Sequence, residues 1–143
     1  SVYMGSRATS TNVSSPGFND LKELLQEKKY RKRFMVSIGS KIKTINSENA
    51  AYIYAHEKTV FLTTFDKSKY TLDQTIEKLS NELEPDKFFK INRKFIININ
   101  AIENMFSLSR SRIKIELKPK LPNELEAIVS VERSQDFKDW LDK

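Results

Sequence analysis

Apolar residues recur at every second position in short runs from Phe34 onward, and this pattern constrains the fold most strongly. Phe34, Val36 and Ile38 form the first run, which stops at the turn residues Gly39-Ser40. The clearest run is 112–117, where three aliphatic residues alternate with three charged ones. Successive side chains of a strand point to opposite faces, so each run predicts a half-buried strand. Short runs separated by turn residues predict a mainly β domain.

The other apolar runs lie between polar or turn-forming segments and complete the set of predicted strands. The polar stretch 46–49 is expected to form at most one helical turn, and the prolines in 118–123 predict a loop. We expect further strands at 42–45, 51–55, 59–65, 69–72, 88–89, 95–97, 102–108 and 127–129.

Two segments have a helical period instead. The first runs from Asp73 to Leu83, because apolar residues recur there at helical spacing and Pro85 disfavours continuation. The second is a terminal helix with Ser130 as the candidate cap. The apolar face of the first helix consists of Leu72, Ile76, Leu79 and Leu83, and that of the second consists of Phe137, Trp140 and Leu141. The expected fold is mainly β with flanking helices.

Residues 1–30 differ in composition from the rest of the chain. Residues 6–17 are rich in Ser, Thr and Asn and predict a flexible linker, and Met4-Gly5-Ser6 resembles an expression remnant. A short helix is expected from Leu21 to about Lys29, followed by basic residues up to Arg33. Linkers of this kind join domains, so we expect a folded domain at 31–143 and a further domain before the linker.

The chain carries a formal net charge of +6, which is compatible with two interpretations. A positive surface attracts polyanions such as nucleic acid. Equally, a charge of this size keeps a small domain soluble without any anionic partner. No apolar run is long enough to span a bilayer, so no membrane association is expected. The absence of cysteine suits a cytoplasmic location.

Catalytic chemistry has little support in the sequence. His56 is the single histidine, and there is no cysteine for a nucleophile or a thiolate metal site. The three glycines form neither a P-loop nor a dinucleotide-binding motif. We therefore expect no enzymatic activity, no metal and no cofactor.

Three polar segments combine hydrogen-bonding side chains with positive charge, as a DNA-reading site requires. The turn His56-Glu57-Lys58 offers donors and an acceptor for base edges. Asn92 and Arg93 match adenine and guanine, and apolar residues on both sides would hold them rigidly. Glu132 and Arg133 lie at the start of the last helix, where a helix N-terminus can also hold a phosphate. Taken alone, the first and third segments fit an ordinary polar turn and a capped helix start better.

Other polar residues in or near turns are expected to contact phosphates, which position a protein on DNA without specifying sequence. These residues are Lys67, Lys69, Lys94, Arg110, Arg112 and Ser130.

The stretch from Phe88 to Asn98, Phe-Phe-Lys-Ile-Asn-Arg-Lys-Phe-Ile-Ile-Asn, resembles the most characteristic part of the LytTR DNA-binding domain family. The Tyr52-Ile53-Tyr54 strand with its turn at His56, the helix at 73–83 and the segment Val129 to Arg133 resemble the same family. The resemblance covers about residues 31–143. It implies small antiparallel β-sheets with one lateral helix, and loops that enter successive major grooves.

The resemblance also implies a biological setting. Members of the family usually follow a receiver domain of two-component systems and bind direct repeats near promoters as dimers. The resemblance implies base contacts at 56–58, at Asn92 and Arg93, and at the start of the last helix. The chain departs from the family there, because Val131-Glu132 precede Arg133 where many relatives have two basic residues. Either Glu132 or Arg133 then faces the base.

Two other functions compete with recognition of double-stranded DNA. The first is a protein-interaction or membrane-linked sensory module that is incidentally basic. The second is single-stranded nucleic acid binding through Tyr52, Tyr54 or Phe61, which requires those rings to be exposed for base stacking.

Overall fold

The structure of the chain is a computed structural model that describes residues 29–143. The linker and the short helix expected to begin at Leu21 lie outside the described residues. Residues Arg31–Lys143 form one compact unit. No helix in this unit is long and apolar enough to cross a membrane.

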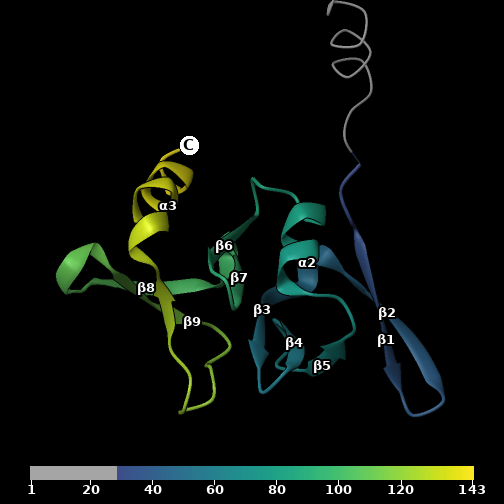
Figure 1. Ribbon diagram of the computed structural model, residues 1–143. Coiled ribbons are helices and arrows are strands. Elements are labelled where there is room, and N and C mark those ends of the chain that lie inside the picture. The colour runs from purple at the N-terminus through teal and green to yellow at the C-terminus, as the bar shows by residue number, and fades with distance from the viewer. Residues whose placement is uncertain (1–28) are drawn as a thin grey trace, which may run out of the picture. The chain divides into compact units, whose positions relative to one another are not determined.

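Strands in the described part form three antiparallel sheets that lie side by side (Figure 1). A hairpin of β1 and β2 lies at one side, and a five-stranded sheet of order β5-β4-β3-β7-β6 is central. A three-stranded sheet of order β10-β9-β8 lies at the other side. The strands are β1 (Arg33–Ile38), β2 (Lys41–Asn46), β3 (Ala50–His56), β4 (Thr59–Thr64), β5 (Lys69–Leu72), β6 (Phe88–Asn92), β7 (Phe95–Asn98), β8 (Ile102–Ser107), β9 (Ile113–Leu117) and β10 (Ala127–Val129). Both the predicted strands and the fold class are confirmed.

The central sheet is buried on both faces because alternate residues of β3 enter two different cores. Ile53 packs with Leu62 and with Leu79 of the lateral helix α2 (Ile76–Glu82). Tyr52 and Tyr54 face the other way, into the core that the three-stranded sheet and the C-terminal helix α3 (Ser134–Leu141) cover. The strand that leads to the His56 turn is therefore fixed from both sides.

The lateral helix begins three residues later than the sequence predicts. Its N-cap is Thr75, whose extended backbone places the side-chain hydroxyl to accept from the Lys78 N–H at 3.1 Å. A capping hydroxyl satisfies one of the free N–H groups of the first turn, so the cap and not Asp73 sets the start. The predicted apolar face is correct, since Leu72, Ile76, Leu79 and Leu83 are all buried.

Replacing the cap tests this assignment. We expect Thr75→Ala to lower the free energy of unfolding by about 1 kcal/mol, because the Lys78 N–H loses its acceptor. Thr75→Ser keeps the hydroxyl and is the matched control, expected to remain close to wild type. Urea denaturation followed by circular dichroism measures both; equal losses in the two variants would contradict a capping role.

The C-terminal helix also begins later than expected. A 3-10 turn, η4 (Val131–Arg133), precedes α3, and the Ser130 side chain makes no capping hydrogen bond. The expected Ser130 cap is therefore wrong, because Ser130 lies one 3-10 turn before the helix. Phe137 and Trp140 are buried as predicted, and the Trp140 indole donates to the Pro85 carbonyl oxygen at 2.6 Å.

Candidate nucleic-acid interface

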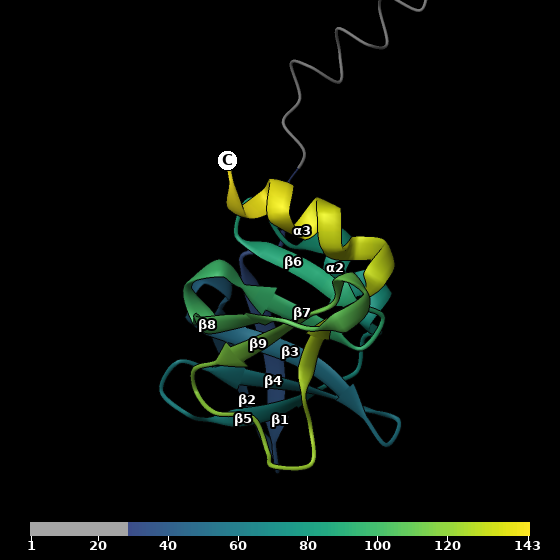
Figure 2. The same ribbon diagram turned by 90° about the vertical axis from the view of Figure 1, so that its left-hand side faces the viewer.

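Sheet topology brings the three predicted reading segments to the same end of the fold. β3 and β7 are antiparallel with Tyr54 opposite Phe95, so the end of β3 lies beside the start of β7. The β3–β4 turn and the β6–β7 turn are thus neighbours. In Figure 2 the β3–β4 turn stands out on the right, on the same side as the start of α3.

Hydrogen bonds tie these segments to one another. The Ala55 N–H, at the end of β3, donates to the Lys94 carbonyl of the β6–β7 turn at 2.9 Å. The Ser130 N–H, just before η4, donates to the Ile91 carbonyl of β6 at 3.1 Å. These bonds hold all three segments in one arrangement, which a surface that reads several base pairs requires.

The β3–β4 turn is a tight hairpin of two residues. His56 pairs with Thr59, and Glu57 and Lys58 have φ values of 49° and 68°. Two successive positive φ angles belong to the hairpin turn whose twist matches that of the flanking strands. Glu57 and Lys58 are exposed, and the His56 imidazole Nε2 lies 3.7 Å from the Glu57 carboxylate.

The β6–β7 turn holds Arg93 in an exposed position. Arg93 and Lys94 are exposed and occupy the turn between the paired residues Asn92 and Phe95. In the described part of the chain neither side chain has a hydrogen bond or an ion pair. Arg93 is free to reach a base edge, and Lys94 is free to reach a phosphate.

Asn92 has a different place from the one expected. Its side-chain N–H donates to the Ile128 carbonyl oxygen of β10 at 2.7 Å, and its Oδ1 accepts from the Lys94 N–H at 2.7 Å. Because both ends of the amide are bound to the protein backbone, Asn92 builds the turn and joins it to β10. We therefore withdraw Asn92 as a base-reading residue. No feature of the sequence distinguishes an asparagine that reads a base from one that binds the backbone.

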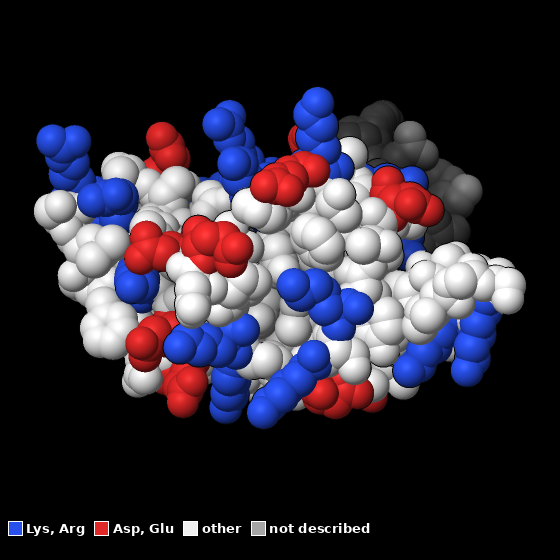
Figure 3. All heavy atoms as spheres, turned by 90° about the horizontal axis from the view of Figure 1, so that it is seen from below, with Lys and Arg blue, Asp and Glu red and all other residues white. Residues whose placement is uncertain are grey.

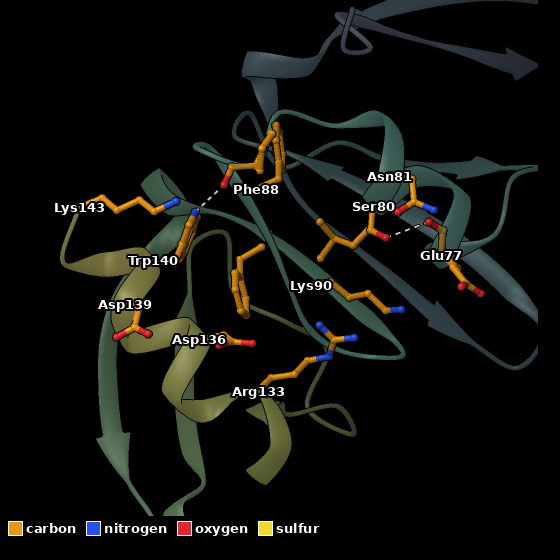
Figure 4. A pocket seen from close by; sticks show the side chains of 13 residues that line it. Glu77, Ser80, Asn81, Phe88, Lys90, Arg133, Asp136, Asp139, Trp140 and Lys143 are labelled. Atoms are coloured by element: carbon orange, nitrogen blue, oxygen red, sulfur yellow. Dashed lines mark hydrogen bonds between the residues drawn. The ribbon is translucent and has the colours of Figure 1, made fainter. Parts of the chain in front are cut away.

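The two base-contact candidates in η4, Glu132 and Arg133, differ in exposure. Glu132 is exposed, whereas Arg133 is half-buried and lines a groove between α2 and α3. Lys90 of β6 lines the same groove, and in Figure 4 its side chain and that of Arg133 point toward the same part of it. Lys90 was not predicted as a site residue; its only sequence signal is its position two residues before Asn92.

Four of the predicted phosphate contacts lie near the reading segments. Arg110 and Arg112 flank Ser111, whose carbonyl oxygen accepts from the Ser134 hydroxyl at the start of α3. Ser130 itself is bound to β6 through its backbone. Lys94, in the β6–β7 turn, lies between the reading segments.

Lys67 and Lys69 do not share this side. Lys67 lies in the β4–β5 turn, at the opposite end of β4 from the His56 turn, and this turn is on the left in Figure 2. A six-residue strand such as β4 spans roughly 20 Å. The Lys69 ammonium lies over the Phe61 ring, 5.4 Å from its centroid. The strand therefore separates Lys67 and Lys69 from the reading segments. Their contact with phosphates stays a prediction that this position does not favour.

On the face seen from below, positive charge is distributed instead of gathered in one patch. Seen from below, lysine and arginine side chains project from the upper and the lower edge, with acidic side chains among them (Figure 3). A surface of this kind fits separate contacts to individual phosphates.

Single-stranded binding through stacked bases is contradicted by burial. Tyr52 and Tyr54 are each 1% exposed, and Phe61 packs on Tyr54 with ring centroids 5.3 Å apart. The Tyr52 hydroxyl donates to the Pro119 carbonyl oxygen at 2.7 Å, and burial raises the pKa of Tyr52 to about 12. These rings belong to the core and offer no platform to a base.

The described residues hold no group of three or more His, Asp or Glu side chains that could bind a metal ion. At the β4–β5 turn, the Thr64 hydroxyl and the Ser68 backbone N–H lower the pKa of Asp66 by hydrogen bonding to its carboxylate. This carboxylate stabilises a turn far from the three reading segments.

The described residues thus form an antiparallel scaffold that presents three linked polar segments at one end. The profile of the LytTr DNA-binding domain family matches residues 40–142. The chain belongs to this family, as the resemblance predicts.

A solved structure supports the fold independently. The chain is similar to the LytTr DNA-binding domain of a methyl-accepting/DNA response regulator from Bacillus cereus, with a TM-score of 0.67 at 16% sequence identity. The match covers 78% of this chain and 97% of that one. No curated protein matches the sequence.

Proposed function

We propose that the chain binds double-stranded DNA sequence-specifically, with the β3–β4 turn, the β6–β7 turn and η4 facing the duplex. Arg93 reads a guanine, while His56, Glu57, Lys58 and Glu132 supply the remaining base contacts. The observation that carries this proposal is the set of backbone hydrogen bonds that joins the three segments at one end of the sheets. Bonds of this kind fix the spacing of side chains, which sequence recognition needs.

Selection from a random duplex library tests the proposal directly. We expect one motif to be enriched and its affinity to fall steeply with salt, because each phosphate contact releases counterions. With Lys94, Arg110, Arg112 and two further cations in contact, the slope of log K against log salt concentration would be about −4 to −5. Fluorescence anisotropy at several salt concentrations measures it. Enrichment of no motif would favour the protein-interaction alternative.

Family membership supports a setting in transcription control. We infer that the domain is the output half of a cytoplasmic two-component response regulator, preceded by a receiver domain and bound to promoter direct repeats as a homodimer. Footprinting on a promoter that carries the selected motif tests this setting. Protection of a single isolated half-site at all concentrations would contradict the dimer.

A further inference from the structure

A groove between α2 and α3 crosses the outer edge of β6 and has a volume of about 510 Å³. Its walls come from both helices and from β6. We call it the α2–α3 groove; Figure 4 shows it from close by. Its lining includes Phe88, Lys90, Arg133, Asp136, Trp140 and Lys143.

Two cations meet at one end of this groove. Figure 4 shows the Lys90 and Arg133 side chains pointing toward the same part of the groove, while Lys143 lies at the opposite end, beyond Trp140. Neither Lys90 nor Arg133 has an ion pair or a side-chain hydrogen bond within the described unit, although both are half-buried. Adjacent like charges repel, so an anion placed between them is favoured.

This end of the groove lies next to the β6–β7 turn. Lys90 is three residues before Arg93, roughly 10 Å along an extended chain. Arg133 is held close by the Ser130–Ile91 hydrogen bond, which joins the start of η4 to β6. A duplex whose base edge meets Arg93 carries backbone phosphates within that range.

We propose that Lys90 and Arg133 together bind one backbone phosphate of the duplex that Arg93 reads. This inference rests on the proposed function and assigns Lys90, which the sequence does not single out, to the DNA contact. Arginine forms a planar fork that matches phosphate oxygens, and lysine adds a point charge. Arg133 is then a phosphate contact, which leaves the base contact in η4 to Glu132.

Carboxylates also line this groove. Glu77, Asp136 and Asp139 are among its lining residues, and Figure 4 draws the Asp136 side chain near Arg133. Like charges repel, so Asp136 opposes the binding of a phosphate at the cationic end.

A duplex with single neutral methylphosphonate linkages tests the shared phosphate. We expect one linkage position to weaken wild-type binding about tenfold at low salt. Lys90→Gln and Arg133→Gln should each weaken binding to the selected and to a scrambled duplex by similar factors, since phosphate contacts carry no sequence information. Both variants should also lose most of their sensitivity to that same linkage position. Lys143→Gln is the matched control and should keep full sensitivity.

Asp136→Asn is expected to change the affinity for DNA in the opposite direction. Removing this carboxylate lowers the repulsion of the phosphate, so affinity for DNA should rise about two- to threefold at low salt. Inorganic phosphate without DNA is the second experiment. If it shifted the NMR signals of Lys90 and Arg133 and a saturating duplex did not, the site would be one for free phosphate and the proposal would be overturned.

The outcomes separate this inference from the proposed function. Unchanged sensitivity to every linkage in Lys90→Gln and Arg133→Gln, with the selected motif still bound through Arg93, overturns the phosphate site alone. Absence of any selected motif in the wild type removes the proposed function itself, and with it this inference.

Discussion

Replacing Arg93 with alanine is expected to weaken binding to the selected duplex by about 5- to 150-fold, equivalent to about 1–3 kcal/mol. The physical reason is the loss of two parallel hydrogen bonds to guanine O6 and N7, which no other base presents in the same pattern. Arg93 is exposed in a two-residue turn and makes no side-chain hydrogen bond or ion pair within the described residues, so the fold should not change.

Specificity gives the sharper readout for this variant. Affinity should be measured for the selected duplex and for a set in which each base pair is changed singly. Wild type should discriminate at every pair of the motif, whereas Arg93→Ala should lose discrimination at one pair only. Arg33→Ala, which removes an exposed arginine from β1, is the charge-matched control and should keep the full pattern. Full discrimination at every pair in Arg93→Ala would show that Arg93 reads no base.

The strands were predictable because burial imposes a period of two that survives in a single sequence. Along β9, Ile113, Ile115 and Leu117 are buried and the residues between them are not, as the alternation predicts. The apolar face of α2 was predictable for the same reason at helical spacing. The first residue of each helix was harder to predict, since Asp73 and Ser130 are chemically as suitable for a cap as Thr75. Which residue caps a helix depends on where the chain enters it, and neighbouring strands determine that.

The exposed placement of candidate site residues was predictable only where a turn residue has no internal partner. Arg93 and Lys58 are exposed in two-residue turns, as their sequence context predicts, and their base contacts stay predictions. Lys67 has the same local context but lies at the wrong end of β4. Only the strand order reveals that difference, because the direction in which each hairpin points is a property of the sheet. The placement of Lys90 and Arg133 in one groove likewise arises from contacts between residues distant in sequence, such as the hydrogen bond that joins Ser130 to Ile91.

Asn92 provides the strongest test of how the scaffold supports recognition. We expect Asn92→Ala to lower the free energy of unfolding by about 2–3 kcal/mol. The reason is that the Ile128 carbonyl and the Lys94 N–H lose their side-chain partner together. Asn104→Ala is the matched control. Its amide makes an exposed bond to Glu116 at 2.9 Å, and its loss should cost less than about 0.5 kcal/mol.

DNA binding by the same variant distinguishes support of the turn from contact with a base. A supporting residue acts through Arg93, so Asn92→Ala should weaken binding to the selected duplex while preference persists, reduced in size, at every base pair. A base-contacting residue would instead lose discrimination at one adenine pair and leave the others unaltered. Titrations at 10 °C, where the variant remains folded, measure this pattern. Loss confined to one pair, with stability close to wild type, would return Asn92 to the reading surface and remove the support that we assign to its two backbone hydrogen bonds.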